Sequence, residues 1–83
     1  MMIYKNLSRR SNVIGYEIHT DSIIVVFADY SKYEYKYGYA GISNVETMKN
    51  LALAGCGLNS YINKYCKYLY SNKTYLPKTS RSY

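Results

Sequence analysis

Residues 32–39 place a tyrosine at every second position. The four rings belong to Tyr33, Tyr35, Tyr37 and Tyr39. Because the side chains of a β-strand alternate between its two faces, this spacing predicts one extended strand with four phenol rings on the same face. Such a face is either a wall of the hydrophobic core or a platform on which bases stack. We expect Tyr33 and Tyr35 to lie in the core, and Tyr37 and Tyr39 to be the more exposed rings.

Two further strands are predicted before this one. Residues 13–18 alternate in type, which is typical of a strand with one buried face. The residues predicted on that face are Ile14, Tyr16 and Ile18. Residues 23–27 form a continuous β-branched and aromatic run, as in a central strand that is covered on both sides. Its core residues would be Ile23, Val25 and Phe27. Ile24 and Val26 would then lie on the opposite face of the sheet.

Two helices are predicted after the strands. Ser43 and Glu46 have the spacing of a capping box in front of an apolar helical pattern. Glycines at positions 55 and 57 would end this first helix. A second helix is expected from Leu58. The residues that recur at helical spacing on its apolar face are Leu58, Ile62, Tyr65, Cys66 and Leu69.

These elements together predict an α+β fold, a three-stranded antiparallel β-meander followed by two α-helices packed on one face. The domain would span residues 11–70. Residues 1–10 read as a polar N-terminal arm, and residues 71–83 as a basic flexible tail.

The charge of the chain is distributed unevenly. All five acidic residues and five of the eleven basic ones lie in residues 1–46, whereas residues 47–83 hold the other six basic residues and no acid. The net charge of +6 therefore belongs to the C-terminal half. Such an asymmetry favours an anionic partner, although a basic surface also serves solubility alone.

Lysines and tyrosines alternate on the predicted second helix, which suits a phosphate backbone with stacked bases. The same pattern also fits a solvated helix flank whose long side chains cover the rim of the core. The residues that we expect to contact an RNA or nucleotide ligand are Arg9, Arg10, Lys36, Tyr37, Tyr61, Lys64, Lys67 and Tyr68.

The order of elements resembles the KTSC domain, a small module that occurs alone or at the C-terminus of some lysyl-tRNA synthetases. The resemblance covers roughly residues 11–65. It rests on Ser11-Asn12, Ile14-Gly15-Tyr16-Glu17, Ile23-x-Val25-x-Phe27, Tyr33-Glu34-Tyr35, and the spacing of Gly55, Leu58, Asn59 and Ile62. The chain departs from the family pattern at Tyr30-Ser31, where the family has a glycine, at Leu53, where it has a serine, and in lacking a proline before the first helix. The resemblance implies the fold described above and, as an expectation, RNA binding.

Catalytic chemistry has little support in this sequence. His19 is the single histidine and belongs to a polar turn with Asp21 and Ser22, and one turn does not assemble a catalytic triad. Cys56 and Cys66 lie ten residues apart, which is not a zinc-ligand spacing. We therefore expect a non-enzymatic protein without a cofactor or a metal.

The absence of a signal sequence or a long apolar segment indicates a cytoplasmic protein with two free thiols and no membrane partner. The abundance of lysine, asparagine, isoleucine and tyrosine is typical of an AT-rich genome, such as a viral one.

Two other functions stay open. Ile24 and Val26 would form an apolar patch on the open sheet face, and such patches mark contacts between proteins. A homo-oligomer or an adaptor for another protein could use this interface. A small signalling nucleotide could also bind between protomers. Salt dependence separates these functions, because phosphate contacts weaken steeply with added salt and apolar contacts do not.

Overall fold

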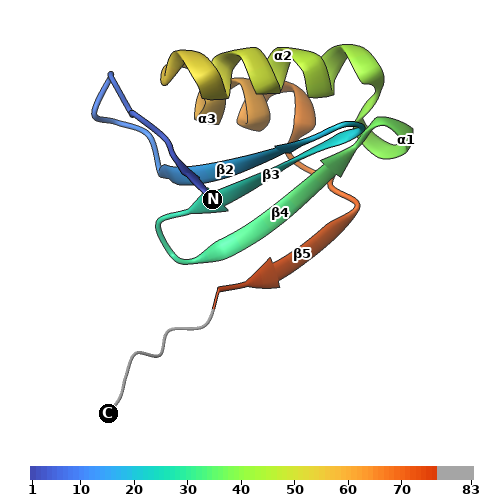
Figure 1. Ribbon diagram of the computed structural model, residues 1–83, viewed down its shortest axis with the longest axis horizontal. Helices are drawn as coiled ribbons and strands as arrows, with labels where there is room; N and C mark the ends of the chain where they lie inside the picture. The colour runs from blue at the N-terminus through green and yellow to red at the C-terminus, as the bar shows by residue number, and fades with distance from the viewer. Residues whose placement is uncertain (77–83) are drawn as a thin grey trace.

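The computed structural model of the protein describes residues 1–76. It has an α+β fold in which helices cover one face of a five-stranded antiparallel sheet (Figure 1). The strands, in the spatial order β1-β2-β3-β4-β5, are β1 (Met2–Ile3), β2 (Val13–His19), β3 (Ser22–Phe27), β4 (Ser31–Lys36) and β5 (Asn72–Tyr75). Between β4 and β5 lie α1 (Tyr37–Ala40), α2 (Ile42–Ala54), α3 (Leu58–Tyr61) and the π-helical turn η1 (Ile62–Cys66). The central meander β2-β3-β4 is the predicted one.

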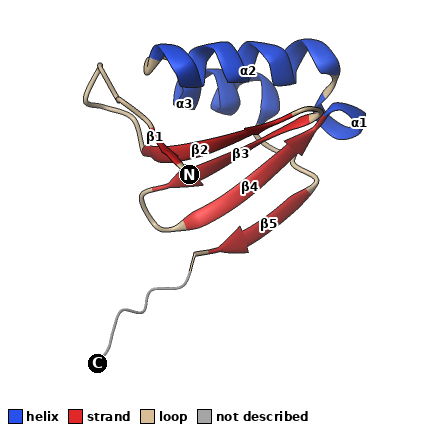
Figure 2. Cartoon of the chain, viewed as in Figure 1, coloured by secondary structure: helices blue, strands red, loops and turns tan. Residues whose placement is uncertain are grey.

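The prediction of three strands was wrong because each end of the chain adds an edge strand (Figure 2). In the predicted N-terminal arm, Met2 pairs with Tyr16, and Tyr4 enters the core. In the predicted tail, Lys73 of β5 pairs with Tyr33 of β4. Backbone hydrogen bonding along an open sheet edge is insensitive to side-chain pattern, so polar segments can provide such strands. Residues 77–83 of the predicted tail lie outside the described residues.

A β-bulge in β2 changes which residues face the core. Val13 pairs with Phe27 and Gly15 with Val26, so Ile14 is an extra residue on this strand. Because a bulge shifts the alternation of side chains, Val13 takes the core position predicted for Ile14. Val13 is buried, whereas Ile14 is only partly buried.

The tyrosine strand is shorter than the alternation predicts. β4 ends at Lys36, and Tyr37 begins the helical turn α1. The amide of Tyr37 still donates to the carbonyl of Asp21 (2.9 Å), which closes the ladder before the chain turns. The strand therefore presents two rings to the helices instead of four. Tyr35 is 1% exposed, and Tyr33 is partly buried at the rim of the core.

Helix α2 begins without the predicted capping box. Its N-cap is Gly41 (φ 92°), and no side chain caps it. Gly41 is both the C-cap of α1 and the N-cap of α2, so the chain enters α2 directly from α1. The carbonyl of Gly41 accepts the first hydrogen bond of α2 from the amide of Val45 (3.0 Å). The C-terminus follows the prediction, because Gly55 is left-handed (φ 75°) and stops the helix.

The core lies between the helices and the sheet. Leu58, Ile62 and Cys66 form the buried stripe of α3 and η1, and they pack with residues of α2 and of the central strands. Tyr65 and Leu69, which were predicted on the same apolar face, are exposed. The apolar face is thus narrower than the spacing predicts. Its narrowness leaves the neighbouring stripes of the helix available for other contacts.

Candidate ligand-binding groove

A groove of about 620 Å³ runs between η1 and the helix-covered face of the sheet. Its floor is formed by rings of the central strands, Phe27, Tyr33 and Tyr35. One wall comes from the helix and consists of Asn59, Ile62, Asn63 and Lys67. The β3–β4 turn supplies Ala28, Asp29 and Ser31, with Asn12 beside them. The remaining wall follows the helix toward β5 and consists of Tyr68, Tyr70 and Lys73.

Tyr33 is the centre of the aromatic floor. Phe27 and Tyr70 both meet it edge to face, with ring centroids 5.4 and 4.9 Å away, and Tyr35 lies nearly parallel to it at 6.4 Å. These geometries are the favourable ones for aromatic pairs. The rings pack against one another and form an aromatic surface at the edge of the core.

Two lysines bring positive charge to this aromatic surface. The Nζ atom of Lys73 lies 5.1 Å from the ring centroid of Tyr33 and 5.4 Å from that of Tyr75. The hydroxyls of Tyr33 and Tyr75 raise the pKa of the Lys73 ammonium. Lys67 extends over the ring of Tyr68, with 5.6 Å between Nζ and the ring centroid. Within residues 1–76 neither lysine forms an ion pair with an acid, so both charges remain available to an anion.

The helix wall is a polar stripe adjacent to the core stripe. Asn59, Asn63 and Lys67 are four residues apart and therefore share one face. The stripe crosses the π-helical turn Ile62–Cys66. Such turns are rare and frequently occur at functional sites. The three side chains line the groove with amide donors, amide acceptors and one cation.

The turn at the end of the floor is held by a carboxylate. Oδ1 of Asp29 accepts hydrogen bonds from the Ser31 hydroxyl (2.6 Å) and the Ser31 amide (3.0 Å). These bonds lower the pKa of the Asp29 carboxyl, which is ionised at neutral pH. Tyr30 between them adopts a left-handed conformation (φ 66°). It occupies the position at which three-residue hairpin loops favour glycine.

Of the eight residues predicted to bind the ligand, Lys67 and Tyr68 line the groove. Tyr61 and Lys64 do not, although they belong to the same helix. The Tyr61 hydroxyl donates to Oδ1 of Asn44 (2.6 Å), which ties α3 to α2. Lys64 instead extends over Tyr65, with 5.5 Å between Nζ and the ring centroid. The predicted tyrosine–lysine stripe is thus divided between a structural contact, an exposed pair and the groove.

The other predicted cations lie away from the groove. Arg9 and Arg10 are exposed in the loop between β1 and β2, and Lys36 is exposed at the end of β4 that is distant from the β3–β4 turn. None of the three is among the groove residues. The structure therefore brings together two of the predicted residues and separates the remainder.

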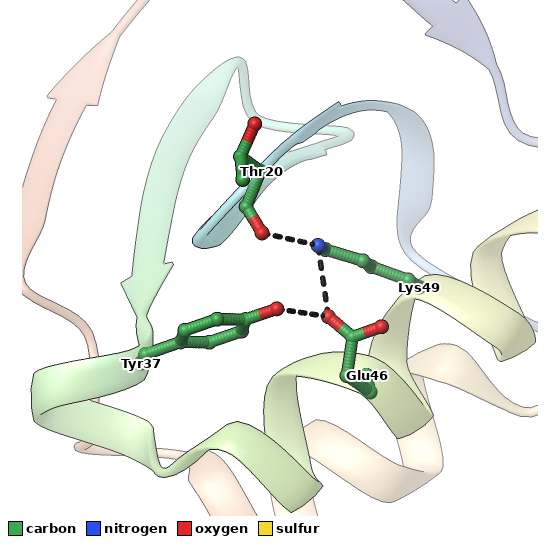
Figure 3. Close-up of polar contacts among 4 residues, drawn as sticks. All are labelled: Thr20, Tyr37, Glu46 and Lys49. Carbon is green, nitrogen blue, oxygen red and sulfur yellow. Dashed lines mark hydrogen bonds and ion pairs between the residues drawn. The ribbon is translucent and has the colours of Figure 1, made fainter.

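Tyr37 belongs to a polar cluster with Glu46, Lys49 and Thr20 (Figure 3). Its hydroxyl donates to Oε2 of Glu46 (2.6 Å), and the Lys49 ammonium contacts the same oxygen at 2.9 Å and donates to the carbonyl of Thr20 (3.2 Å). Lys49 is only 9% exposed. The bond from Tyr37 and the ammonium of Lys49 lower the pKa of Glu46, and Glu46 raises the pKa of Lys49. The cluster joins α1 and α2 to the β2–β3 turn.

The apolar patch predicted on the open sheet face is not present. Val26 is 0% exposed, and Ile24 is partly buried. Gly15 pairs with Val26, and the side chain of Met1 lies against that glycine, so the N-terminal segment covers this part of the face. Ile24 is surrounded by polar residues of β4 and β5, namely Lys32, Glu34, Asn72 and Thr74. The physical reason for the difference is that both missed edge segments, the one at the N-terminus and β5, cover parts of this face.

Sequence reasoning missed several groove residues, and only some of these carry a signal in the sequence that could have identified them. Asn59 and Asn63 carried a signal, because they precede Lys67 at intervals of four residues beside the buried stripe. Tyr70 and Lys73 carried none, because their position depends on the pairing of β5 with β4. Asp29 read as an ordinary turn residue.

Cys56 is exposed and Cys66 is buried, both as free thiols, and burial raises the pKa of Cys66. Among residues 1–76 there is no group of three or more histidine, cysteine and acidic side chains that could hold a metal ion. In the same part of the chain, no helix is long and apolar enough to cross a membrane.

Comparison of the chain with protein-family models, with curated proteins and with solved structures found no match.

Proposed function

We propose that the protein is a non-enzymatic binding module for RNA or a nucleotide-type anionic ligand, with its site in the groove between η1 and the sheet. The single observation that carries the proposal is the meeting, in one groove, of an aromatic floor with two lysines that form no ion pair with any acid of residues 1–76. A base stacks on an aromatic ring irrespective of its identity, and lysines neutralise the phosphate that accompanies it.

The dimensions and charges of the groove support this function. Its volume of about 620 Å³ lies within the range of small-ligand sites, about 300–1,000 Å³. Both cations, Lys67 and Lys73, come from the C-terminal half of the chain, which holds six basic residues and no acid. The implied relationship to the KTSC domain is part of the same proposal and agrees with a small nucleic-acid-binding module.

Two neighbouring lysine–tyrosine pairs, one within η1 and one in the turn that follows it, provide a matched test. Lys67 and Tyr68 line the groove, whereas Lys64 and Tyr65 form a similar pair outside it. Tyr68 is 78% exposed and Tyr65 is 54% exposed, so neither substitution to alanine removes a core residue. The double variants Lys67→Ala/Tyr68→Ala and Lys64→Ala/Tyr65→Ala lose the same atoms and the same charge.

Binding is measured by fluorescence anisotropy with a labelled single-stranded RNA octamer of mixed sequence at low salt. The first variant should weaken binding by between about five- and a hundredfold from the lost stacking alone, and the second should leave it unchanged. Two phosphate contacts should give a log–log salt slope of about −1.4, and Lys67→Ala should halve it. Equal effects of the two double variants, or no binding of RNA or nucleotides by the unmodified protein, would contradict the proposal.

A further inference from the structure

Asp29 is the one acidic side chain that lines the groove within residues 1–76. Both hydrogen bonds donated by Ser31 end on Oδ1 of this carboxylate. No hydrogen bond from another described residue ends on Oδ2. An ionised carboxylate accepts about four hydrogen bonds, two on each oxygen. Oδ1 therefore holds both bonds from Ser31, and Oδ2 remains an acceptor at the end of an aromatic groove.

We infer that the groove selects guanine, and that the Asp29 carboxylate reads the Watson–Crick edge of the base. This inference rests on the proposed function and narrows it. Proteins that bind unstacked bases hold them on aromatic rings and read their Watson–Crick edges through hydrogen bonds. Here the rings of Phe27, Tyr33 and Tyr70 line the groove, and the exposed Asp29 belongs to the β3–β4 turn at its end.

The choice of guanine follows from the donors on each base. The Watson–Crick edge of guanine presents two adjacent donors, the ring N1–H and the exocyclic amino group. Adenine and cytosine present one amino group next to an acceptor nitrogen, and uracil presents one N–H between two carbonyls. A carboxylate only accepts, so it is matched by the guanine edge and repelled by neighbouring acceptors on the other bases.

The charges of the groove orient such a nucleotide. The negative Asp29 disfavours a phosphate at the turn, whereas Lys67 and Lys73 attract one on the helix and β5 walls. Within residues 1–76 Asp29 forms no ion pair with either lysine. Lys73 nevertheless lies close enough to Asp29 to add to the hydrogen bonds from Ser31 in lowering the pKa of its carboxyl. The proposed positions of the base and the phosphate are therefore adjacent.

Asp29→Asn is a selective test because it preserves the turn. The asparagine side-chain oxygen still accepts from Ser31, while an NH₂ donor replaces the Oδ2 acceptor. Asp21→Asn is the matched control, since Asp21 is an exposed carboxylate on the β2–β3 turn outside the groove. Both substitutions change the net charge equally. A difference between the two variants in the ratio of the GMP and UMP dissociation constants therefore reports on base recognition and not on charge.

The dissociation constants of GMP, IMP, AMP, CMP and UMP are measured by NMR titration at low salt. We expect GMP to bind about ten times more tightly than UMP, and IMP, which lacks the exocyclic amino group, to be intermediate. Asp29→Asn should bring the GMP-to-UMP ratio close to one, and Asp21→Asn should leave it unchanged. A preference that persists in Asp29→Asn overturns the inference.

The test also separates this inference from the proposed function. Equal dissociation constants for all five nucleotides in the unmodified protein overturn the guanine preference and leave the binding module intact. If none of the five nucleotides binds, and the RNA octamer does not bind either, both proposals fail. A single guanine within a uridine tract repeats the comparison in RNA without the self-association of guanine-rich strands.

Discussion

The two ends of β4 carry the same types of side chain and use them differently. Beyond its C-terminal end, Tyr37, Glu46 and Lys49 form a closed cluster in which the lysine contacts a carboxylate and a backbone carbonyl. At its N-terminal end, Asp29 and Tyr33 stand near Lys73 in an open groove without an ion pair between acid and lysine.

This difference shows that residue type alone does not distinguish a structural contact from a binding site. What distinguishes them is whether the chain itself satisfies the polar groups. The Lys49 ammonium forms an ion pair with Glu46 and donates to the Thr20 carbonyl, and the residue is nearly buried. Lys73 faces two rings and solvent. Polar groups that the protein leaves unsatisfied at an aromatic groove are the ones available to a ligand.

The largest expected effect on stability is in the closed cluster. Lys49→Ala removes the contacts of the ammonium to Glu46 and Thr20, together with a packed side-chain stem. The free energy of unfolding should fall by about 2 kcal/mol, the size expected for hydrogen bonds of a charged group. Urea denaturation measures this change, and Lys64→Ala on the surface should shift it by less than about 0.5 kcal/mol. RNA binding that weakens in folded Lys49→Ala would show that the cluster is not purely structural.

In the groove, the substitution Lys73→Ala should have the opposite profile. Affinity for the RNA octamer should fall roughly tenfold, because one charge-assisted contact to phosphate is lost. The urea midpoint should hardly change, since Lys73 is exposed and forms no ion pair within the described residues. The buried thiol of Cys66 provides a second check on folding, because it should resist thiol reagents in the folded variant. If Lys73→Ala lowered the stability without lowering the affinity for RNA, Lys73 would have a structural role like that of Lys49, and the contrast between the groove and the closed cluster would be wrong.

The smallest expected effect concerns the backbone next to Asp29. Tyr30 is left-handed (φ 66°) without being glycine. This conformation costs about 1–2 kcal/mol for a residue with a Cβ atom, and glycine loses about 0.5–1 kcal/mol through its greater flexibility when unfolded. Tyr30→Gly should therefore stabilise the protein by roughly 0.5–1 kcal/mol in thermal or urea denaturation.

Tyr39→Gly is the control for this change, since Tyr39 is also an exposed tyrosine but lies in the helical turn α1. It should destabilise the protein, because glycine is a poor helix residue. Destabilisation by Tyr30→Gly would mean that the ring of Tyr30 contributes more than its backbone costs.

Much of the central fold was predictable from local patterns. The alternation through Tyr35 and the apolar run around Val25 predicted adjacent strands, and Gly55 predicted the end of α2. The alternation failed at Tyr37 because the chain turns into α1 there, although the pattern of tyrosines continues. The β2 bulge was also invisible, because a bulge arises from the pairing of two strands and not from one strand alone.

The candidate site was predictable only in part. Lys67 and Tyr68 were identified because basic and aromatic residues alternate on the helix. Tyr61 and Lys64 share that pattern and lie elsewhere, because the helix presents only one stripe to the groove. Tyr37 lies outside the groove, and its contact with Glu46 was not visible in the sequence because Glu46 belongs to another helix.

Local sequence patterns suffice to predict the α+β class, the three central strands and the positive charge of the C-terminal half, because strand alternation, glycine stops and charge are local properties. The sheet edges and the groove depend instead on contacts between segments that are distant in the sequence. The pairing of Lys73 with Tyr33 joins segments forty residues apart through backbone hydrogen bonds, which carry almost no side-chain signature. That pairing brings the second lysine to the aromatic floor and converts a row of tyrosines into a candidate binding site.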